Sequence, residues 1–248
     1  MTASRSCQHV DDPASSSQPF RKRVVRTLLV SAVVCWGALA FLGPAPVHAQ
    51  SKSPSPSKRI EIPASLPKIG ELGENVYDLA KARDWTKTAE KLAALEDAVK
   101  GLAADSAAAR ADKDRLKAHM AALGKAVTAK DRQAAMREAN RVTLIAANLT
   151  EPFDPKVPVD VTRLDYYGRE LEVWAAAGDK DRLKATATAM RKTWDRLRPA
   201  VVAHKGAAEA KQVDELMAQV EAAKSSREYG LVATPVLEAV DQLEKVFK

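Results

Sequence analysis

The sequence predicts an all-α protein made of two tandem antiparallel four-helix bundles, with one elongated helical bundle as the alternative. Apolar residues recur at steps of three and four from residue 64 onward, which is the period of amphipathic helices. A proline-rich segment separates two stretches of similar length. The 248 residues are 46% hydrophobic and 29% charged but only 5% aromatic, which is typical of alanine-rich helical proteins rather than sheet or disordered chains.

The clearest helical hairpin covers residues 162–197. One Gly178-Asp179 break separates its two apolar stripes. Because the break is short, the helices must run antiparallel and need a partner hairpin to cover their apolar sides. The stripes consist of Leu164, Tyr167, Leu171 and Trp174 before the break, and of Leu183, Ala187, Met190, Trp194 and Leu197 after it.

The first half, residues 64–150, contains four predicted helices. The first begins near Ser65, and the second follows Asp84, which is a favourable N-cap residue. The fourth follows Thr128 and Asp131, which stand at capping-box spacing. The apolar stripes are, in order, Leu66, Ile69, Leu72, Val76 and Leu79; Trp85, Leu92, Leu95, Val99 and Leu102; Leu116, Met120, Leu123 and Val127; and Ala135, Ala139, Val142, Ile145 and Leu149.

Residues 151–161 form a predicted linker, because three prolines cannot continue a helix. The second half, residues 162–248, opens with the hairpin and continues with two more helices. Ser225 and Glu228 stand at capping-box spacing before the last one, and Pro235 predicts a kink or a restart with Thr234 as a local cap. The apolar stripes of these last two helices are Val213, Leu216, Met217 and Val220, and Val232, Val236, Val240, Leu243 and Phe247.

The two halves match with one constant offset, which indicates an internal duplication. Helix lengths and apolar positions agree better than residue identities do. The Pro-rich linker further predicts that few contacts cross between the two units. The matched positions include Leu66 and Leu164, Thr88 and Thr186, Asp97 and Asp195, Val142 and Val240, and Leu149 and Phe247.

Residues 1–49 have the pattern of a signal peptide. Arg21, Lys22, Arg23 and Arg26 precede an apolar run over 27–43, and Val47-His48-Ala49 is a small-residue cleavage site. Cleavage there predicts a periplasmic or extracellular chain that starts at Gln50, with no membrane insertion. The alternative is an uncleaved anchor in the inner membrane, because the run is nearly long enough to span a bilayer. Residues 50–63 are Ser/Pro-rich and predict a flexible linker.

Composition excludes several classes of chemistry. Both cysteines, Cys7 and Cys35, precede the predicted cleavage site, so the mature chain has no thiol for a disulfide, zinc ligand or nucleophile. The net charge is +7, but residues 50–248 hold 34 Lys and Arg against 30 Asp and Glu. Because these charges alternate along the helices, they predict a solvated mixed surface and no nucleic-acid partner. Phosphate-binding and hydrolase motifs are missing from the sequence.

Each half resembles the periplasmic four-helix-bundle cytochromes, the c-prime type and its soluble b-type relative. The likeness lies in export, unit length and paired tight hairpins, of which LEVWAAAGDKDRLKATATAMRKTWDRL is an example. The resemblance implies a bundle, and the haem ligands of that family do not carry over. No CxxCH motif is present in the mature chain, the first stripes offer Leu66 and Leu164 in place of a methionine, and neither last helix contains a histidine. No cofactor is therefore predicted.

His119 and Met120 are the only candidate metal or haem ligands that the sequence offers. His119 has no carboxylate three or four residues away on its helix, so we interpret it as a partly buried flank histidine. Trp85, Trp174 and Trp194 occupy stripe positions and predict core packing, as do Met190 and Met217. No catalytic residue is predicted.

Three hypotheses for function follow. The first is a non-enzymatic periplasmic binding module whose partner is an envelope protein or peptide. The second is a metal- or haem-binding bundle that uses His119 and Met120. The third is an enzyme with a diffuse carboxylate site, which requires residues such as Glu138 or Glu172 to turn inward, although the stripes do not indicate this.

Overall fold

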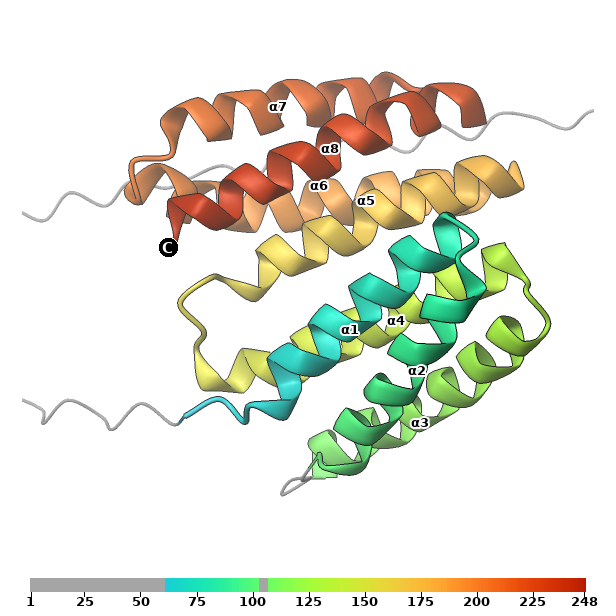
Figure 1. Cartoon of the computed structure of the whole chain (residues 1–248). Helices are drawn as coiled ribbons and strands as arrows, with labels where there is room; N and C mark the ends of the chain where they lie inside the picture. Colours follow the sequence, from blue (N-terminus) through green and yellow to red (C-terminus); the bar gives the residue numbers. More distant parts are fainter. Residues whose placement is uncertain (1–60, 103–106) are drawn as a thin grey trace, which may run out of the picture. The chain divides into compact units, whose positions relative to one another are not determined.

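The computed structural model describes residues 61–102 and 107–248 (Figure 1). The predicted signal peptide, 1–49, and most of the lead-in, 50–63, lie outside these residues. The described chain is all α, as predicted, with eight α-helices, one 3-10 helix and no strand. The elements are α1 (Ser65–Lys81), α2 (Trp85–Lys100), α3 (Ala107–Thr128), α4 (Arg132–Thr150), the 3-10 helix η1 (Glu151–Phe153), α5 (Val159–Ala177), α6 (Lys180–Ala203), α7 (Ala207–Ala222) and α8 (Ser226–Val246).

Helices α1 to α4 form one group whose main contacts join α4 to α1 and α3, and α1 to α2 (Figure 1). Gly73 lets α1 and α4 approach closely, because a Cβ atom there would lie 2.6 Å from Thr143 Oγ1. The predicted stripes supply the core of this group. Its fully buried members include Ile69, Val76, Leu95, Leu116, Leu123, Ala135 and Val142.

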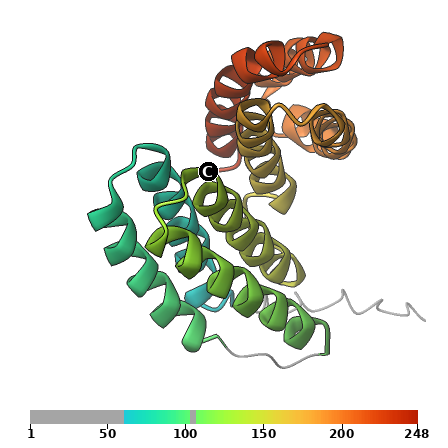
Figure 2. The same ribbon diagram turned by 90° about the vertical axis from the view of Figure 1, so that its right-hand side faces the viewer.

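Helices α5 to α8 form the second group, in which α5 packs on α8 and α6 in both views of the ribbon (Figure 2). Trp194 is fully buried and donates a hydrogen bond from Nε1 to Asp214 Oδ1 at 2.8 Å. The indole thus fills core space while its polar atom is satisfied. The other large buried side chains of this group are Leu164, Leu171, Leu183, Met190, Met217 and Leu243.

Most helix starts are where the sequence predicts them. Asp84 Oδ1 accepts a hydrogen bond from Lys87 N, and Ser225 and Glu228 form a complete capping box at the start of α8. The capping box expected from Thr128 and Asp131 is wrong. Thr128 is the last residue of α3 and donates to Gly124 O, whereas Asp131 itself is the N-cap of α4.

Proline does not end helices where the sequence suggests. The chain stays helical through Pro235, so the predicted restart with a Thr234 cap is wrong. Proline removes one backbone hydrogen bond and crowds the carbonyl one turn before it, but the buried stripe on both sides of Pro235 keeps the helix packed against its neighbours. The linker is also shorter than predicted, because η1 and the first residues of α5 lie within 151–161.

Helix α5 is buried on two sides instead of one. Leu164 and Leu171 face the second core as expected, but Tyr167 and Trp174 are only partly buried. Tyr166 and Val173, on the other side, are each only 2% exposed because α4 packs against them. The expectation that few contacts cross the linker is therefore wrong. We call the contact of α5 with α1 and α4 the seam.

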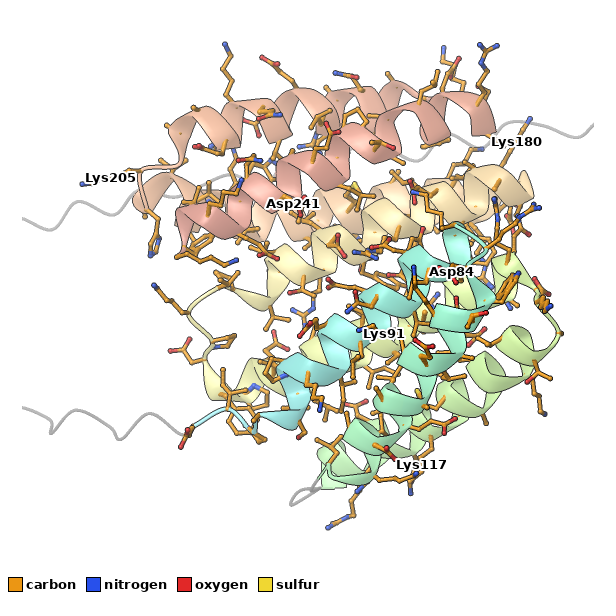
Figure 3. All side chains as sticks on the ribbon, in the orientation of Figure 1. Asp84, Lys91, Lys117, Lys180, Lys205 and Asp241 are labelled. Atoms are coloured by element: carbon orange, nitrogen blue, oxygen red, sulfur yellow. The ribbon has the colours of Figure 1, made fainter. Side chains whose placement is uncertain are left out.

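The surface carries both signs of charge. Lys91, Lys117, Lys180 and Lys205 are exposed, and the last three lie at the outer edge of the view in Figure 3. Many other basic side chains pair with acids one turn away, as Lys100 does with Asp97 at 2.9 Å. Within the part of the chain that the structure describes, no helix has the length and apolar character needed to cross a membrane.

Candidate functional site

Arg169 of α5 is the centre of the seam. Its Nε donates to Asp165 Oδ2 at 2.8 Å, and its guanidinium lies 4.9 Å from the centre of the Tyr77 ring of α1. Longer ion pairs join it to Asp78, at 3.6 Å, and to Glu74, at 3.8 Å. The residue is only 9% exposed, so these acids partly compensate a buried cation.

The electrostatics of the seam follow from burial and from an excess of acids. Burial opposes the charge of Arg169, but Asp165, Glu74 and Asp78 together raise its pKa. Burial raises the pKa of Asp165, and Arg169 offsets only part of this effect. Burial, followed by repulsion from Asp165, raises the pKa of Glu74 from 4.5 to about 7. Since the Glu74 side chain keeps 40% of its exposure, water still reaches this carboxyl group.

A second polar cluster joins α1 to α5. Tyr77 donates from its hydroxyl to Glu172 Oε2 at 2.8 Å, and Lys81 Nζ lies 2.7 Å from Glu172 Oε1. Burial, together with the neighbouring Glu172 charge, raises the pKa of Tyr77, so the phenol stays protonated and donates. Asn140 of α4 adds a bond from Nδ2 to Tyr166 O at 3.0 Å. These side chains hold the two groups together.

Next to the Arg169 cluster lies a pocket of about 600 Å³, which we call the seam pocket. Its floor is the groove between α1 and α4, and its walls are the connection after η1, the start of α5 and the end of α8. Gly70 opens the floor, because nothing lies within 4 Å of a Cβ atom built there. The lining residues are Ile62, Leu66, Pro67, Gly70, Glu71, Glu74, Thr143, Ala146, Ala147, Thr150, Pro155, Val157, Val159, Thr162, Glu244 and Lys248.

The charged groups of the seam pocket are mostly acidic. Glu71, Glu74 and Glu244 line it, against one lysine, Lys248. Lys248 Nζ lies 3.0 Å from Glu244 Oε2, so its charge is already paired. Thr150 donates its hydroxyl to Ala146 O at 2.8 Å, which leaves the oxygen free to accept. The pocket therefore combines apolar walls with carboxylate and hydroxyl acceptors.

The candidate ligands His119 and Met120 belong to α3 and do not line the seam pocket. His119 is partly buried, and its Nδ1 lies 2.8 Å from Glu138 Oε2 of α4. Met120 belongs to the first core, with 8% exposure. Among the described residues, no group of three or more His, Cys, Asp or Glu side chains could hold a metal ion.

Glu138 and Glu172 are more buried than their stripes indicate, with side chains that are 12% and 13% exposed. Each is engaged by neighbours, Glu138 by His119 and Arg137, and Glu172 by Tyr77 and Lys81. The two do not share a site. Their contacts fit structural ion pairs between helices.

The tryptophans divide into core and edge positions. Trp194 is a core residue as predicted, whereas Trp85 and Trp174 are partly buried. Trp174 donates from Nε1 to Glu170 Oε2 at 2.6 Å, and the Arg182 guanidinium lies 5.2 Å from the centre of its ring. Met190 and Met217 fill the second core, as expected.

Comparison with known proteins identifies no relative. No family model matches the chain, and neither a curated protein nor a solved structure is significantly similar to it.

Sequence reasoning misses Glu74, Arg169 and Gly70. A usable signal was present in α5, where Asp165 and Arg169 stand one turn apart among Tyr166 and Val173, a second apolar stripe. Gly70 and Gly73, in the middle of a helix, also signal a close approach or an opening. Nothing in α1 by itself shows that Glu74 meets α5.

Proposed function

We propose that this chain is an exported, non-enzymatic helical-bundle protein that acts as a binding module in the periplasm, and that its ligand occupies the seam pocket. The pocket carries the proposal, because it is concave, mostly apolar and supplied with a few polar groups at one place. Its volume of about 600 Å³ is within the range of sites that take small molecules or a short stretch of peptide.

The chemistry of the lining residues supports binding rather than catalysis. The pocket has carboxylates and threonine hydroxyls, and its residues include no histidine, cysteine or tyrosine to act as a nucleophile or a general base. The nearby polar side chains of the seam are engaged in ion pairs and hydrogen bonds between helices. Such groups position helices and leave little free for a reaction.

We further propose that each group is an antiparallel four-helix bundle and that the two arose by internal duplication. Thr88 and Thr186 support this, because both are buried polar residues at the same place in their halves. The strongest contacts also correspond, with the first helix of each group packed on the last. Two bundles joined by the seam create a pocket that one bundle alone would not have.

Export is tested at the N-terminus. Mass spectrometry of the protein extracted from the cell envelope is expected to give Gln50 as the first residue. An intact N-terminus found only in the membrane fraction would make the protein an anchored one and contradict the proposed cleavage.

Binding is tested with N-phenylnaphthylamine, a neutral dye that fluoresces in apolar sites. The protein is expected to enhance its fluorescence in a saturable manner. Gly70→Leu should abolish the enhancement, because its side chain grows into open space in the pocket floor without a clash. Gly124→Leu is the matched control, since Gly124 is also a helical glycine with nothing within 4 Å of its Cβ position and does not line the pocket. Equal dye binding by the protein and by Gly70→Leu would refute the pocket as the site.

A further inference from the structure

We infer that the seam pocket binds a small amphiphilic primary amine, with the ammonium group at Glu74 and the hydrocarbon body along the groove between α1 and α4. The inference rests on the proposed function, because it names the class of ligand for that pocket. Three observations carry it: the charge of the lining, the kind of acceptor atoms present and the position of the apolar walls.

The charge of the pocket favours a cation. Glu71 has no salt-bridge partner among the described residues, and Glu74 has only Arg169, at 3.8 Å. Arg169 in turn lies closer to Asp165, at 2.8 Å, so its nearest carboxylate partner is Asp165 and not Glu74. An anionic ligand would meet this group of carboxylates in a partly enclosed space, where repulsion is strong. A cation would instead offset the excess of negative charge in the lining.

The acceptor atoms favour a primary ammonium over a quaternary one. Sites for quaternary ammonium groups are built from aromatic rings. The seam pocket has no aromatic lining residue, and offers carboxylate oxygens and the hydroxyls of Thr150 and Thr162. A primary ammonium carries three N–H donors, which need oxygen acceptors of this kind. The lining therefore matches a group that donates hydrogen bonds.

The apolar walls lie where a hydrocarbon chain can reach them from Glu74. Along α1, Gly70, Pro67 and Leu66 follow Glu74 toward the start of the helix on the same face, and Ile62 comes before it. On the opposite side are Ala146, Ala147, Val157 and Val159. Two turns of helix correspond to about 11 Å, which a chain of roughly ten carbons spans. A decyl chain is therefore a suitable probe.

Binding of an ammonium group should release a proton. The ionisable groups that face Glu74 are Asp78 of α1, Asp165 and Arg169 of α5, and Glu244 of α8. Their net negative charge, added to burial, holds part of Glu74 protonated near pH 7. The amine is already fully charged there, with a pKa of about 10. Affinity for the amine should therefore rise between about pH 6 and pH 8, as Glu74 ionises.

The experiment measures displacement of N-phenylnaphthylamine by four decyl compounds: decylamine, decyltrimethylammonium, decanol and decanoate. Decylamine is expected to bind on the order of tenfold more tightly than each of the others, which corresponds to about 1.4 kcal/mol. Glu74→Gln should remove most of this preference and its rise with pH. Glu71→Gln deletes the same charge at an exposed position of the same helix and should have the smaller effect.

Each outcome decides between the two proposals. If the dye binds at Gly70 but decanol or decanoate competes as well as decylamine, the inference fails and the binding function stands. If decylamine keeps its advantage in Glu74→Gln, the ammonium does not bind where we place it and the inference also fails. If decyltrimethylammonium binds as tightly as decylamine, the site recognises positive charge without preferring a primary amine. The inference then fails as well. Absence of dye binding contradicts the proposed function itself.

Discussion

Glu74 shows how one partly buried carboxyl group links the stability of the fold to the pH. Its pKa of about 7 exceeds the 4.5 of an exposed glutamate, so the folded protein holds a proton that the unfolded chain has lost between these values. Stability from this group is therefore complete below about pH 4.5 and decreases as the pH rises through 7. The loss is moderated by solvent, because the side chain is 40% exposed.

Glu74→Gln should accordingly stabilise the protein at high pH. We expect a gain of about 1 kcal/mol at pH 8, reduced from the full shift for solvent screening, and little change at pH 5. Urea unfolding at the two pH values measures this change in the free energy of unfolding. Glu71→Gln controls for the loss of one negative charge on α1. A gain of the same size at pH 5 would show that titration of Glu74 is not the cause.

At the scale of the helix, local signals predict where elements start. Ser225 accepts a hydrogen bond from Glu228 N at 3.3 Å, and Glu228 reaches back to Ser225 N at 3.2 Å. Ser225→Ala should therefore cost about 1 kcal/mol, because Glu228 N loses its acceptor while the backbone N–H of residue 225 can still donate to Glu228. Thermal unfolding measures it, and Ser226→Ala, one residue into the helix, is the matched control. Equal losses in the two variants would mean that the capping box does not stabilise α8.

The same local signals explain how much of the fold the sequence contains. The apolar stripes of α1, α6 and α8 and the Asp84 cap depend on neighbours three or four residues away, so a single pass along the chain finds them. The capping box predicted at Thr128 is wrong because the Thr128 hydroxyl donates to Gly124 O within its own helix. This local hydrogen bond competes with capping. The restart predicted at Pro235 is wrong because packing of α8 outweighs the loss of one backbone hydrogen bond.

The candidate site was not predictable in this way. It depends on α1, α4, α5 and α8 meeting, and so on pairs such as Glu74 and Arg169 that are far apart in sequence. A charged residue beside an apolar stripe is normally solvated, and only the packing of α5 on two sides turns Arg169 inward. Burial on both sides also weakens the amphipathic pattern of α5, because polar and apolar residues are then mixed around it.

At the scale of the whole molecule, Arg169 is the most consequential side chain of the seam. Arg169→Met should cost about 3 to 5 kcal/mol near pH 8, since it leaves Asp165, Glu74 and Asp78 without their cation. The cost should shrink near pH 5, below the raised pKa of Glu74, because protonation of Glu74 then removes part of the repulsion. Lys81→Met, at a half-exposed ion pair, should cost less than about 1 kcal/mol. A cost for Arg169→Met that does not change with pH would contradict this account.

The seam also predicts how the two groups unfold. The Tyr77, Asn140 and Arg169 contacts are lost when either group unfolds, and the apolar faces of Tyr166 and Val173 would become exposed. Either group without its neighbour therefore loses stability, so unfolding of one should bring about unfolding of the other.

Two core truncations test this coupling, one in each group. Leu95 in α2 and Trp194 in α6 are both fully buried, and Leu95→Ala and Trp194→Ala should cost about 2 to 5 and 3 to 5 kcal/mol through lost burial and residual cavities. Because the groups are coupled, each variant should shift a single thermal transition of the whole chain to lower temperature when helix content is followed by circular dichroism. Arg169→Met, which weakens the seam, should let the transition of Trp194→Ala split into two steps. Two steps in the unmodified protein, with each truncation lowering only its own, would show that the seam contacts do not couple the groups and that each unfolds independently.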